Sequence, residues 1–331
     1  MKKINLAFAG CRHGHIFSLL NLAKENPDIN LCGGWEEYEP DRETAIKEHN
    51  LEFRYNTYEE LLADSTIDAV AIGNYYQARG QMVIDALKAG KHVYVDKPIC
   101  TSLEELETIK KLQKETKLSV FIMLDLRFHK NVRTAKNLID AGEIGEINNI
   151  CFTGQHPLLY GKRAGWYFEE GKHGGTINDI AIHGIDLVRH FTNSDVKEIN
   201  GARTWNKYAK EVPYFNDSAM FLITMENGAG VMADVSYASP ETIAFSHPFY
   251  WEFTIWGTEG MLSFTYYTDG VSLYKNGNTE VVVCEGTEPD INYVEAFVNE
   301  VNGKDPIYLS TEESLKSAQK TLEIQYKADN K

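Results

Sequence analysis

The sequence predicts a two-domain protein, with an N-terminal doubly wound parallel sheet followed by an α+β domain built on a mainly antiparallel sheet. Short apolar runs alternate with helical patterns from residue 3 to residue 123. After residue 124 the chain becomes rich in Thr, Val, Tyr and Phe, which favour strands. A length of 331 residues suffices for two hydrophobic cores. We therefore expect domains at residues 1–123 and 124–331.

The elements of the first half follow from apolar periodicity and from capping residues. Thr57 is followed three residues later by Glu60, the pattern of a capping box, and Ser102 is a second expected N-cap. Strands alternating with helices imply a parallel sheet, in which ligands bind at the carboxyl ends of the strands. The expected strands are 3–9, 30–35, 67–72, 92–95 and 119–123, and the expected helices are 15–25, 40–49, 57–63, 81–89 and 103–116.

The second half is expected to be mainly strands between residues 148 and 285. The turn signals Glu226-Asn227-Gly228 and Lys275-Asn276-Gly277 predict hairpins. A less regular segment at 155–175 and a helix at 179–191 interrupt the strands. The remaining expected helices are 131–141, 292–302 and 311–327, the last of which we expect near the first domain.

Composition excludes several classes of protein. A formal net charge of −15 argues against a nucleic-acid-binding surface. The sequence contains no stretch near the roughly 18 apolar residues that span a bilayer. The five cysteines are scattered without metal-binding spacing, which is typical of reduced thiols in a cytoplasmic protein. The histidines show no zinc-like spacing either, so no metal is predicted.

The turn after the first strand is the first candidate binding site. In the dinucleotide fingerprint G-x-G-x-x-G, Gly10 fits the first position, Arg12 occupies the second and His15 the third. The N-terminus of the following helix can still bind a pyrophosphate. An ordinary strand-to-helix turn is the alternative interpretation. The turn reads Gly10-Cys11-Arg12-His13-Gly14-His15.

Acidic and polar residues follow the next two strands. Glu37 lies at the end of the second strand, where an acid typically binds a ribose 2′-hydroxyl and repels a 2′-phosphate. This favours NAD over NADP. Glu36 is the neighbouring candidate, and a solvated pair of glutamates is the alternative. Gly73 and Asn74 follow the third strand at the same edge of the sheet.

Lys97 follows the fourth strand, between Asp96 and Pro98. Pro98 keeps Lys97 out of helical geometry and therefore at the edge of the sheet. A lysine in this place can hydrogen-bond a substrate hydroxyl and lower the cost of losing its proton. A surface lysine without a role is the alternative.

Asp179 and His183 are four residues apart and would share one helix face. Histidine is a natural general base near neutral pH. The preceding Gly174-Gly175 pair permits close approach of a ligand. A capping aspartate with a core histidine is the alternative. Asp186 and His190 have the same spacing, so spacing alone is not diagnostic.

Taken in this order, the motifs resemble the glucose–fructose oxidoreductase / inositol dehydrogenase / MocA family. Residues 68–98 resemble its strand–helix–strand unit that ends in E-K-P, with Asp96 in place of Glu. Residues 174–191 resemble its G-G-x-x-x-D-x-x-x-H helix. The linker 138–147 and the segments 227–237 and 256–264 resemble further parts of the family pattern, so that the resemblance covers nearly the whole chain.

The resemblance implies a Rossmann domain and an open-faced, mainly antiparallel sheet domain through which members often oligomerise. Most members exchange a hydride between NAD or NADP and a hydroxyl or carbonyl of a sugar, cyclitol or related polyol. It implies that Lys97 contacts the reacting hydroxyl, Asp179 orients the substrate and His183 is the acid/base. The expected cofactor-binding residues are Gly10, Cys11, Arg12, His13, Gly14, His15, Glu37, Gly73, Asn74 and Lys97.

Two other functions stay open at this point. One is a glycosidase that oxidises a sugar transiently and retains its NAD, and the other is a non-catalytic regulatory protein that binds a dinucleotide or sugar. The chain departs from the family in its glycine turn and in the loop 73–77, which lacks the T-P-N sequence and the later His. Apolar alternation along 251–256 and 264–267 predicts an oligomer contact on one face of the second sheet. Further candidates to line a pocket are Arg127, His156, Arg163, Trp166 and Tyr167.

Overall fold

A computed structural model of the chain describes residues 2–330, which divide into two compact units. Unit 1 comprises residues 1–123, 164–174 and 291–319. Unit 2 comprises residues 124–163, 175–290 and 320–331. No helix in the described range is both long enough and apolar enough to cross a membrane.

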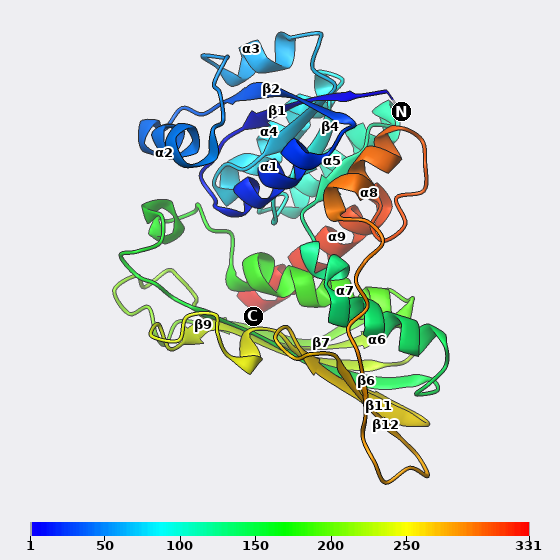
Figure 1. Cartoon of the computed structure of the whole chain (residues 1–331). Coiled ribbons are helices and arrows are strands. Elements are labelled where there is room, and N and C mark those ends of the chain that lie inside the picture. Colours follow the sequence, from blue (N-terminus) through cyan, green and yellow to red (C-terminus); the bar gives the residue numbers. More distant parts are fainter. Residues whose placement is uncertain (1, 331) are drawn as a thin grey trace. The chain divides into compact units, whose positions relative to one another are not determined.

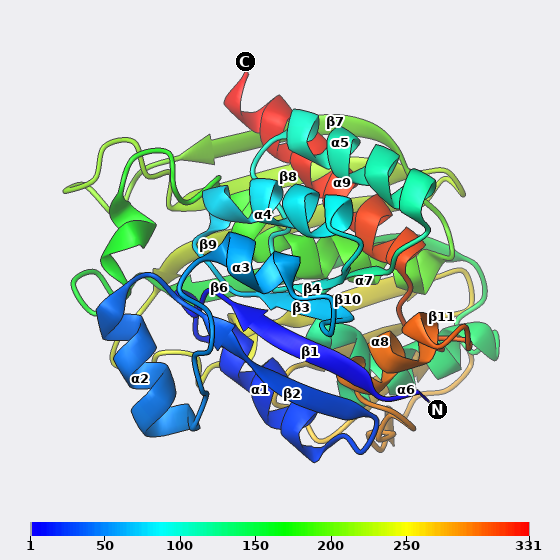
Figure 2. The same cartoon turned by 90° about the horizontal axis from the view of Figure 1, so that it is seen from above.

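Unit 1 is built on a five-stranded sheet in the order β2-β1-β3-β4-β5, with every pair parallel. The order reverses between β1 and β3, and because crossovers are right-handed, α1 and α4 lie on opposite faces (Figure 2). Its elements are β1 (Ile4–Ala9), α1 (His15–Glu25), β2 (Ile29–Trp35), α2 (Glu39–His49), α3 (Tyr58–Ala63), β3 (Ala69–Ile72), α4 (Tyr76–Lys88), β4 (His92–Val95), α5 (Leu103–Thr116), β5 (Val120–Ile122), η2 (Gly165–Phe168) and α8 (Tyr293–Val301).

The sequence accounts for the elements of unit 1 through burial and capping. The central strands β3 and β4 are apolar and almost wholly buried, as expected for a parallel sheet covered on both faces. The side chain of Thr57 accepts a hydrogen bond from the Glu60 backbone N–H at 3.1 Å, and Ser102 caps α5 in the same way. The predicted doubly wound parallel sheet is therefore confirmed.

Unit 2 is built on an eight-stranded sheet in the order β13-β12-β11-β10-β6-β9-β8-β7. Only β6 and β9 pair in parallel, so the predicted mainly antiparallel sheet is also confirmed. Figure 1 shows α6 and α7 on one face of this sheet. Its elements are η1 (Asp125–Phe128), α6 (Lys130–Asp140), β6 (Ile147–Pro157), η3 (Ile177–Ala181), α7 (Ile182–Thr192), β7 (Val196–Trp205), β8 (Ser218–Met225), β9 (Gly230–Ser239), η4 (Pro248–Tyr250), β10 (Glu252–Gly257), β11 (Gly260–Thr265), β12 (Val271–Lys275) and β13 (Val282–Cys284).

Three predicted helices differ from the observed ones. The helix expected at 81–89 begins five residues earlier, at Tyr76. The helix expected at 179–191 opens with a π-helical stretch, η3, before α7 continues as a regular α-helix. The closing helix α9 (Thr311–Asp329) is two residues longer than expected, and its residues divide between the two units at 319/320.

Candidate functional site

The first candidate site lies in unit 1, where the loops after β1, β3 and β4 meet at the carboxyl edge of the sheet. The His13 backbone N–H donates to the Gly73 carbonyl at 3.1 Å, which joins the first loop to the second. The Asp96 N–H donates to the Ile72 carbonyl at 3.0 Å, which fixes the start of the third. The switch of strand order between β1 and β3 makes this edge the expected place for a ligand.

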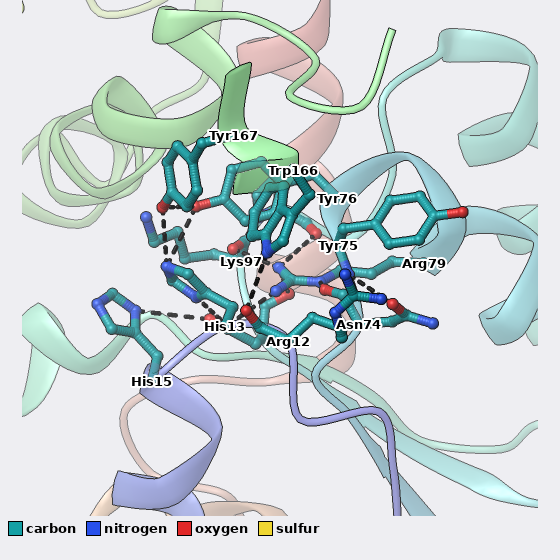
Figure 3. Close-up of polar contacts among 12 residues, drawn as sticks. Arg12, His13, His15, Asn74, Tyr75, Tyr76, Arg79, Lys97, Trp166 and Tyr167 are labelled. Carbon is teal, nitrogen blue, oxygen red and sulfur yellow. Dashed lines mark hydrogen bonds and ion pairs between the residues drawn. The ribbon is translucent and has the colours of Figure 1, made fainter. Parts of the chain in front are cut away.

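Asp96 is the buried hub of this edge. Its Oδ2 atom lies 2.9 Å from Nη2 of Arg79 and 2.5 Å from Nδ1 of His13, and its side chain is fully buried. Burial alone would raise the pKa of Asp96, but Arg79 and His13 outweigh it and hold that pKa well below its usual range. Arg79 also donates to the carbonyls of Asn74, Asp96 and Lys97, so one guanidinium ties two loops together (Figure 3).

His13 connects Asp96 to a pair of tyrosines. Its Nε2 atom lies 2.9 Å from the hydroxyl of Tyr167 and 3.2 Å from that of Tyr76, and the two hydroxyls are 2.6 Å apart (Figure 3). Burial lowers the pKa of His13 to about 3, because the attraction of Asp96 does not offset the loss of hydration. His13 is therefore neutral near pH 7, and a neutral ring that donates to Asp96 through Nδ1 accepts from a tyrosine through Nε2.

Trp166 and Tyr167, which contact the turn after β1, come from η2. The indole Nε1–H of Trp166 donates to the Arg12 carbonyl at 3.0 Å, and Tyr167 bonds to His13 as described. Tyr76, Trp166 and Tyr167 form one buried aromatic cluster. The sequence named Trp166 and Tyr167 as candidates without their orientation, whereas Tyr76 and Arg79 were missed because an ordinary helix start shows no chemical pattern.

Lys97 is buried at this edge, with 4 % of its surface exposed, rather than lying on the surface. Its amine is 5.9 Å from the centre of the Tyr76 ring, within range of a cation–π interaction. A buried ammonium group is costly unless polar partners surround it, which makes such a lysine a functional candidate.

The two glutamates after β2 have different surroundings. Glu36 is buried, and its carboxylate accepts hydrogen bonds from the backbone N–H groups of Cys11 at 2.5 Å and Tyr38 at 2.8 Å. Burial raises the pKa of Glu36, which these N–H groups partly oppose. Glu37 is exposed to solvent. Of the two acids, Glu37 is therefore the one whose side chain is open to a ligand.

The turn after β1 is the expected phosphate site of a dinucleotide. Helix α1 begins at His15 after the N-cap Gly14, and the N–H groups of Ile16 and Phe17 donate to the carbonyls of His13 and Gly14 at 3.3 and 3.2 Å. Gly10 has φ +81°, and a Cβ there would lie 2.8 Å from the Asn74 backbone nitrogen. The close approach of these two loops therefore requires glycine at position 10.

A metal ion fits this edge poorly. Among residues 2–330, His13, His15 and Asp96 form a group whose potential ligand atoms lie within 4.8 Å of one another. Asp96 is already paired with Arg79, and His15 stands at the positive N-terminal end of α1. These charges oppose a cation, so we interpret the group as an ion-pair network.

The second candidate site lies in unit 2, around Asp179 and His183. The Tyr237 hydroxyl donates to Oδ2 of Asp179, and both Asp179 and His183 are buried. His183 Nδ1 is 3.7 Å from Oδ1 of Asp125, and its ring is 5.7 Å from that of Trp251. Asp179 and His183 thus come from one helical turn. Asp125 was missed because it lies in a segment without a recognisable motif, and Tyr237 because the resemblance of residues 227–237 to a family strand implies no site role for it.

The similarly spaced Asp186 and His190 have a structural environment. Both carboxylate oxygens of Asp186 pair with Arg127, at 2.6 and 2.7 Å, and both side chains are buried. Burial, followed by repulsion from Arg127, lowers the pKa of His190 well below its usual value. Arg127, expected near a pocket, therefore has a buried ion-pair partner of its own.

The two remaining pocket candidates also lie in unit 2. His156 lies 5.0 Å from Tyr250 and 5.8 Å from Trp251, measured between ring centres. Arg163 donates to the carbonyls of Pro157 and Leu158 and lies over the Tyr237 ring at 5.3 Å. Tyr237 therefore contacts Arg163 through its ring and Asp179 through its hydroxyl group.

The fold and the carboxyl-edge site together define a dinucleotide-binding Rossmann domain joined to an open-sheet domain. Residues 4–124 match the model of the oxidoreductase family with an NAD-binding Rossmann fold, and residues 132–263 match the GFO/IDH/MocA C-terminal domain. The chain belongs to the GFO/IDH/MocA oxidoreductase family.

Known relatives are distant. The scyllo-inositol 2-dehydrogenase (NAD(+)) of Bacillus subtilis is 27% identical over 310 residues, covering 87% of this chain and 83% of that protein. The uncharacterized oxidoreductase YrbE of the same species is 28% identical over 194 residues, 57% of this chain and only 54% of YrbE. A solved structure from Erwinia carotovora atroseptica is 22% identical with a TM-score of 0.88, covering 98% of this chain and 99% of the other. This structural likeness supports the fold alone.

Proposed function

We propose that this protein is an NAD-dependent dehydrogenase that acts on a CH–OH group of a sugar, cyclitol or related polyol. The buried Lys97, at the same sheet edge as the turn suited to dinucleotide phosphates, is the observation that carries the proposal. The scyllo-inositol 2-dehydrogenase of B. subtilis supports the class of substrate by its name. We assign the dinucleotide to the domain of residues 1–123 and the substrate to that of residues 124–331.

Each proposed residue has one role. Lys97 hydrogen-bonds the reacting hydroxyl, Asp179 orients the substrate, and His183 takes the hydroxyl proton during oxidation or returns it during reduction. The hydrogen bond from Tyr237 supports the role of Asp179, because it fixes the direction of the carboxylate. A bound nicotinamide would supply the hydride acceptor. The loops that contain Gly10–His15, Gly73 and Asn74 would hold the cofactor, and Glu37 would favour NAD over NADP.

The first test identifies the nucleotide and the balance of the reaction. Mass spectrometry of the purified protein shows whether NAD or NADP copurifies. Turnover of a panel of polyols and sugars is then followed at the nicotinamide absorbance band. Net NADH formation supports the dehydrogenase. Release of product without net NADH would favour the glycosidase that retains its cofactor, and nucleotide binding without any turnover would favour the regulatory protein.

The second test concerns the base. Proton transfer by a positioned side chain is worth about 10²–10⁴ in rate, so His183→Ala should lower kcat by roughly that factor with nucleotide affinity nearly unchanged. Lys97→Ala should also lower turnover. His190→Ala is the matched control, since His190 has the same spacing from an aspartate but lies beside the Arg127–Asp186 pair. Loss of activity in His190→Ala but not in His183→Ala, with both proteins folded, would contradict the assignment.

A further inference from the structure

Glu36, the first acid after β2, does not have the freedom that cofactor selection requires, unlike the exposed Glu37. In dinucleotide folds this acid binds the ribose 2′-hydroxyl. The Glu36 carboxylate instead accepts from two backbone N–H groups, those of Cys11 and Tyr38, and its side chain is buried. Glu36 therefore holds the β1–α1 turn together, and discrimination against a 2′-phosphate must come from groups around it.

Arg12 is a cation close to Glu36, since its charge opposes the rise in the pKa of that acid. Its Nε atom lies 2.8 Å from Oδ2 of Asp41, and its guanidinium lies over the Tyr38 ring at 4.2 Å and near the Tyr75 ring at 5.8 Å. Only 12% of the Arg12 side chain is exposed. The guanidinium is thus held between the turn after β1 and the start of α2, where an arginine in related folds accommodates a 2′-phosphate.

The contact between Arg12 and Asp41 is an ion pair without good hydrogen-bond alignment. Within residues 2–330, the buried Nε of Arg12 is one of the polar atoms that has no hydrogen-bond partner. Asp41 neutralises the guanidinium, and its pairing with Arg12 opposes the rise in the pKa of Asp41 that burial causes. Because Asp41 already lies against Nε, a further acceptor would have to bind the terminal nitrogens of the guanidinium.

The charges around the Arg12–Asp41 ion pair explain its expected effect on the binding of a 2′-phosphate. Four acids, Glu36, Glu37, Glu39 and Asp41, surround two arginines, Arg12 and Arg42, along the end of β2 and the start of α2. The excess of negative charge repels a 2′-phosphate. Removal of the Asp41 charge would take away the carboxylate paired with Arg12 and would lower the local excess from two negative charges to one.

We propose that the Arg12–Asp41 ion pair sets the cofactor specificity of this protein, with Asp41 excluding NADP by neutralising Arg12. This inference rests on the proposed function, because it concerns the same dinucleotide site. Asp41→Asn keeps the size and the polar character of the side chain and removes its charge. In this variant Arg12 pairs with the 2′-phosphate, and the ratio of NADP to NAD affinity rises by about tenfold, the effect of roughly 1.4 kcal/mol.

The test is calorimetry of NAD⁺ and NADP⁺ binding to the purified full-length protein. The wild type should bind NAD⁺ more tightly, and Asp41→Asn should gain affinity for NADP⁺ with little change for NAD⁺. Adding Arg12→Gln to Asp41→Asn should abolish that gain. Glu39→Gln is the matched control. Glu39 lies in the same first turn of α2 as Asp41, but its side chain is largely exposed and its ion pair is with Arg42, at 4.0 Å.

Further variants in the same binding assay separate the competing explanations of cofactor specificity. Glu37→Ala tests the exposed acid in the same assay. An equal gain in Glu37→Ala, Glu39→Gln and Asp41→Asn would mean that general charge and not the pair selects the cofactor. A gain that survives Arg12→Gln would also overturn the inference. Absence of binding of either nucleotide would refute the proposed function itself, whereas binding with an unchanged ratio in Asp41→Asn would refute only the role of the pair.

Discussion

At the scale of the residue, His13 shows how a side chain at a variable position of the turn after β1 sets the chemistry of that loop. A glycine in this turn would offer only backbone, whereas His13 links Asp96 to the hydroxyls of Tyr76 and Tyr167. Each of these groups is buried, so each contact replaces a hydrogen bond to water. The turn after β1 is therefore fixed by side chains as well as by its backbone.

The buried neutral His13 should make the protein sensitive to acid. Its pKa is lowered from 6.5 to about 3, so between these values the unfolded chain binds a proton that the folded chain does not. Stability is fully present above pH 6.5 and is lost as the pH falls toward 3, with a slope of at most about 1.4 kcal/mol per pH unit for this proton. We expect His13→Gln to show a shallower fall of the urea midpoint between pH 6.5 and 4. Identical pH profiles for both proteins would contradict this.

Part of the candidate site could be predicted from the sequence because its residues lie in local patterns. Lys97 follows a buried strand, and Asp179 and His183 share a helix, so each stands out without knowledge of the fold. The partners Arg79, Tyr237 and Asp125 could not be found in this way, because their contacts join segments far apart in the chain. The convergence of Lys97 with Asp179 and His183 remains a prediction.

At the scale of the element, a glycine allows α7 to pack closely against the sheet of unit 2. Gly184 lies in α7, where a Cβ would come within 2.1 Å of the Phe152 ring on β6. The absence of a side chain lets the helix approach the sheet closely. The π-helical η3 directly precedes this point of contact, and it contains Asp179.

Gly184→Ala should therefore destabilise unit 2, although alanine is normally the better helix former. Phe152 is buried and cannot move aside without disturbing the core, so we expect a cost of about 1–3 kcal/mol. Gly201→Ala is the matched control, since nothing lies within 4 Å of a Cβ at that position. Urea unfolding measures both variants. A stable Gly184→Ala protein would show that α7 can shift at little cost.

Helix boundaries were predictable where a cap is present and less so elsewhere. The sequence predicted α3 and α5 to within a residue, because the capping residues Thr57 and Ser102 mark their starts, and it predicted α1 equally well although Gly14 provides no side-chain cap. The start of α4 was placed too late. Its interior Gly80 interrupts the helical pattern, and a Cβ there would lie 2.5 Å from the carboxyl group of Glu105 on α5.

At the scale of the whole molecule, the face of the unit 2 sheet opposite α6 and α7 carries no α-helix from residues 124–290 (Figure 1). Side chains alternate along β9, with Val231, Ala233 and Val235 buried and Met232 exposed. Met232 pairs with Leu222 of β8, which is equally exposed. The predicted alternation along 251–256 has Trp251, Phe253 and Ile255 in the core, and Trp256 at the surface.

We expect this apolar face to be covered by another copy of the chain, because large exposed apolar patches mark interaction sites. Light scattering at micromolar concentration should give a multiple of the monomer mass. The double variant Leu222→Lys, Met232→Lys should reduce that mass without unfolding the protein, and Lys substitutions at the exposed Tyr326 of α9 should not. A monomeric wild type would refute the expectation.

The architecture of the two sheets could be predicted because each is encoded by periodicity along a continuous stretch. The division of the chain into units could not be read in the same way. Residues 164–174 and 291–319 belong to unit 1, although both follow segments of unit 2. Their membership depends on contacts such as those of Trp166 with Arg12 and of Tyr293 with Tyr94, which leave no periodic trace.

Because residues 164–174 belong to unit 1, the protein cannot be divided into fragments at residue 123 without losing contacts of that unit. A fragment ending at residue 123 would contain the whole parallel sheet but would lack Trp166 and Tyr167, so the Arg12 carbonyl would lose the indole N–H and the His13 ring would lose one of its two tyrosine hydroxyls. Residues 1–123 alone are therefore not a self-contained nucleotide-binding domain. Exchange of unit 1 between relatives would have to include this short segment and residues 291–319 along with the first 123 residues.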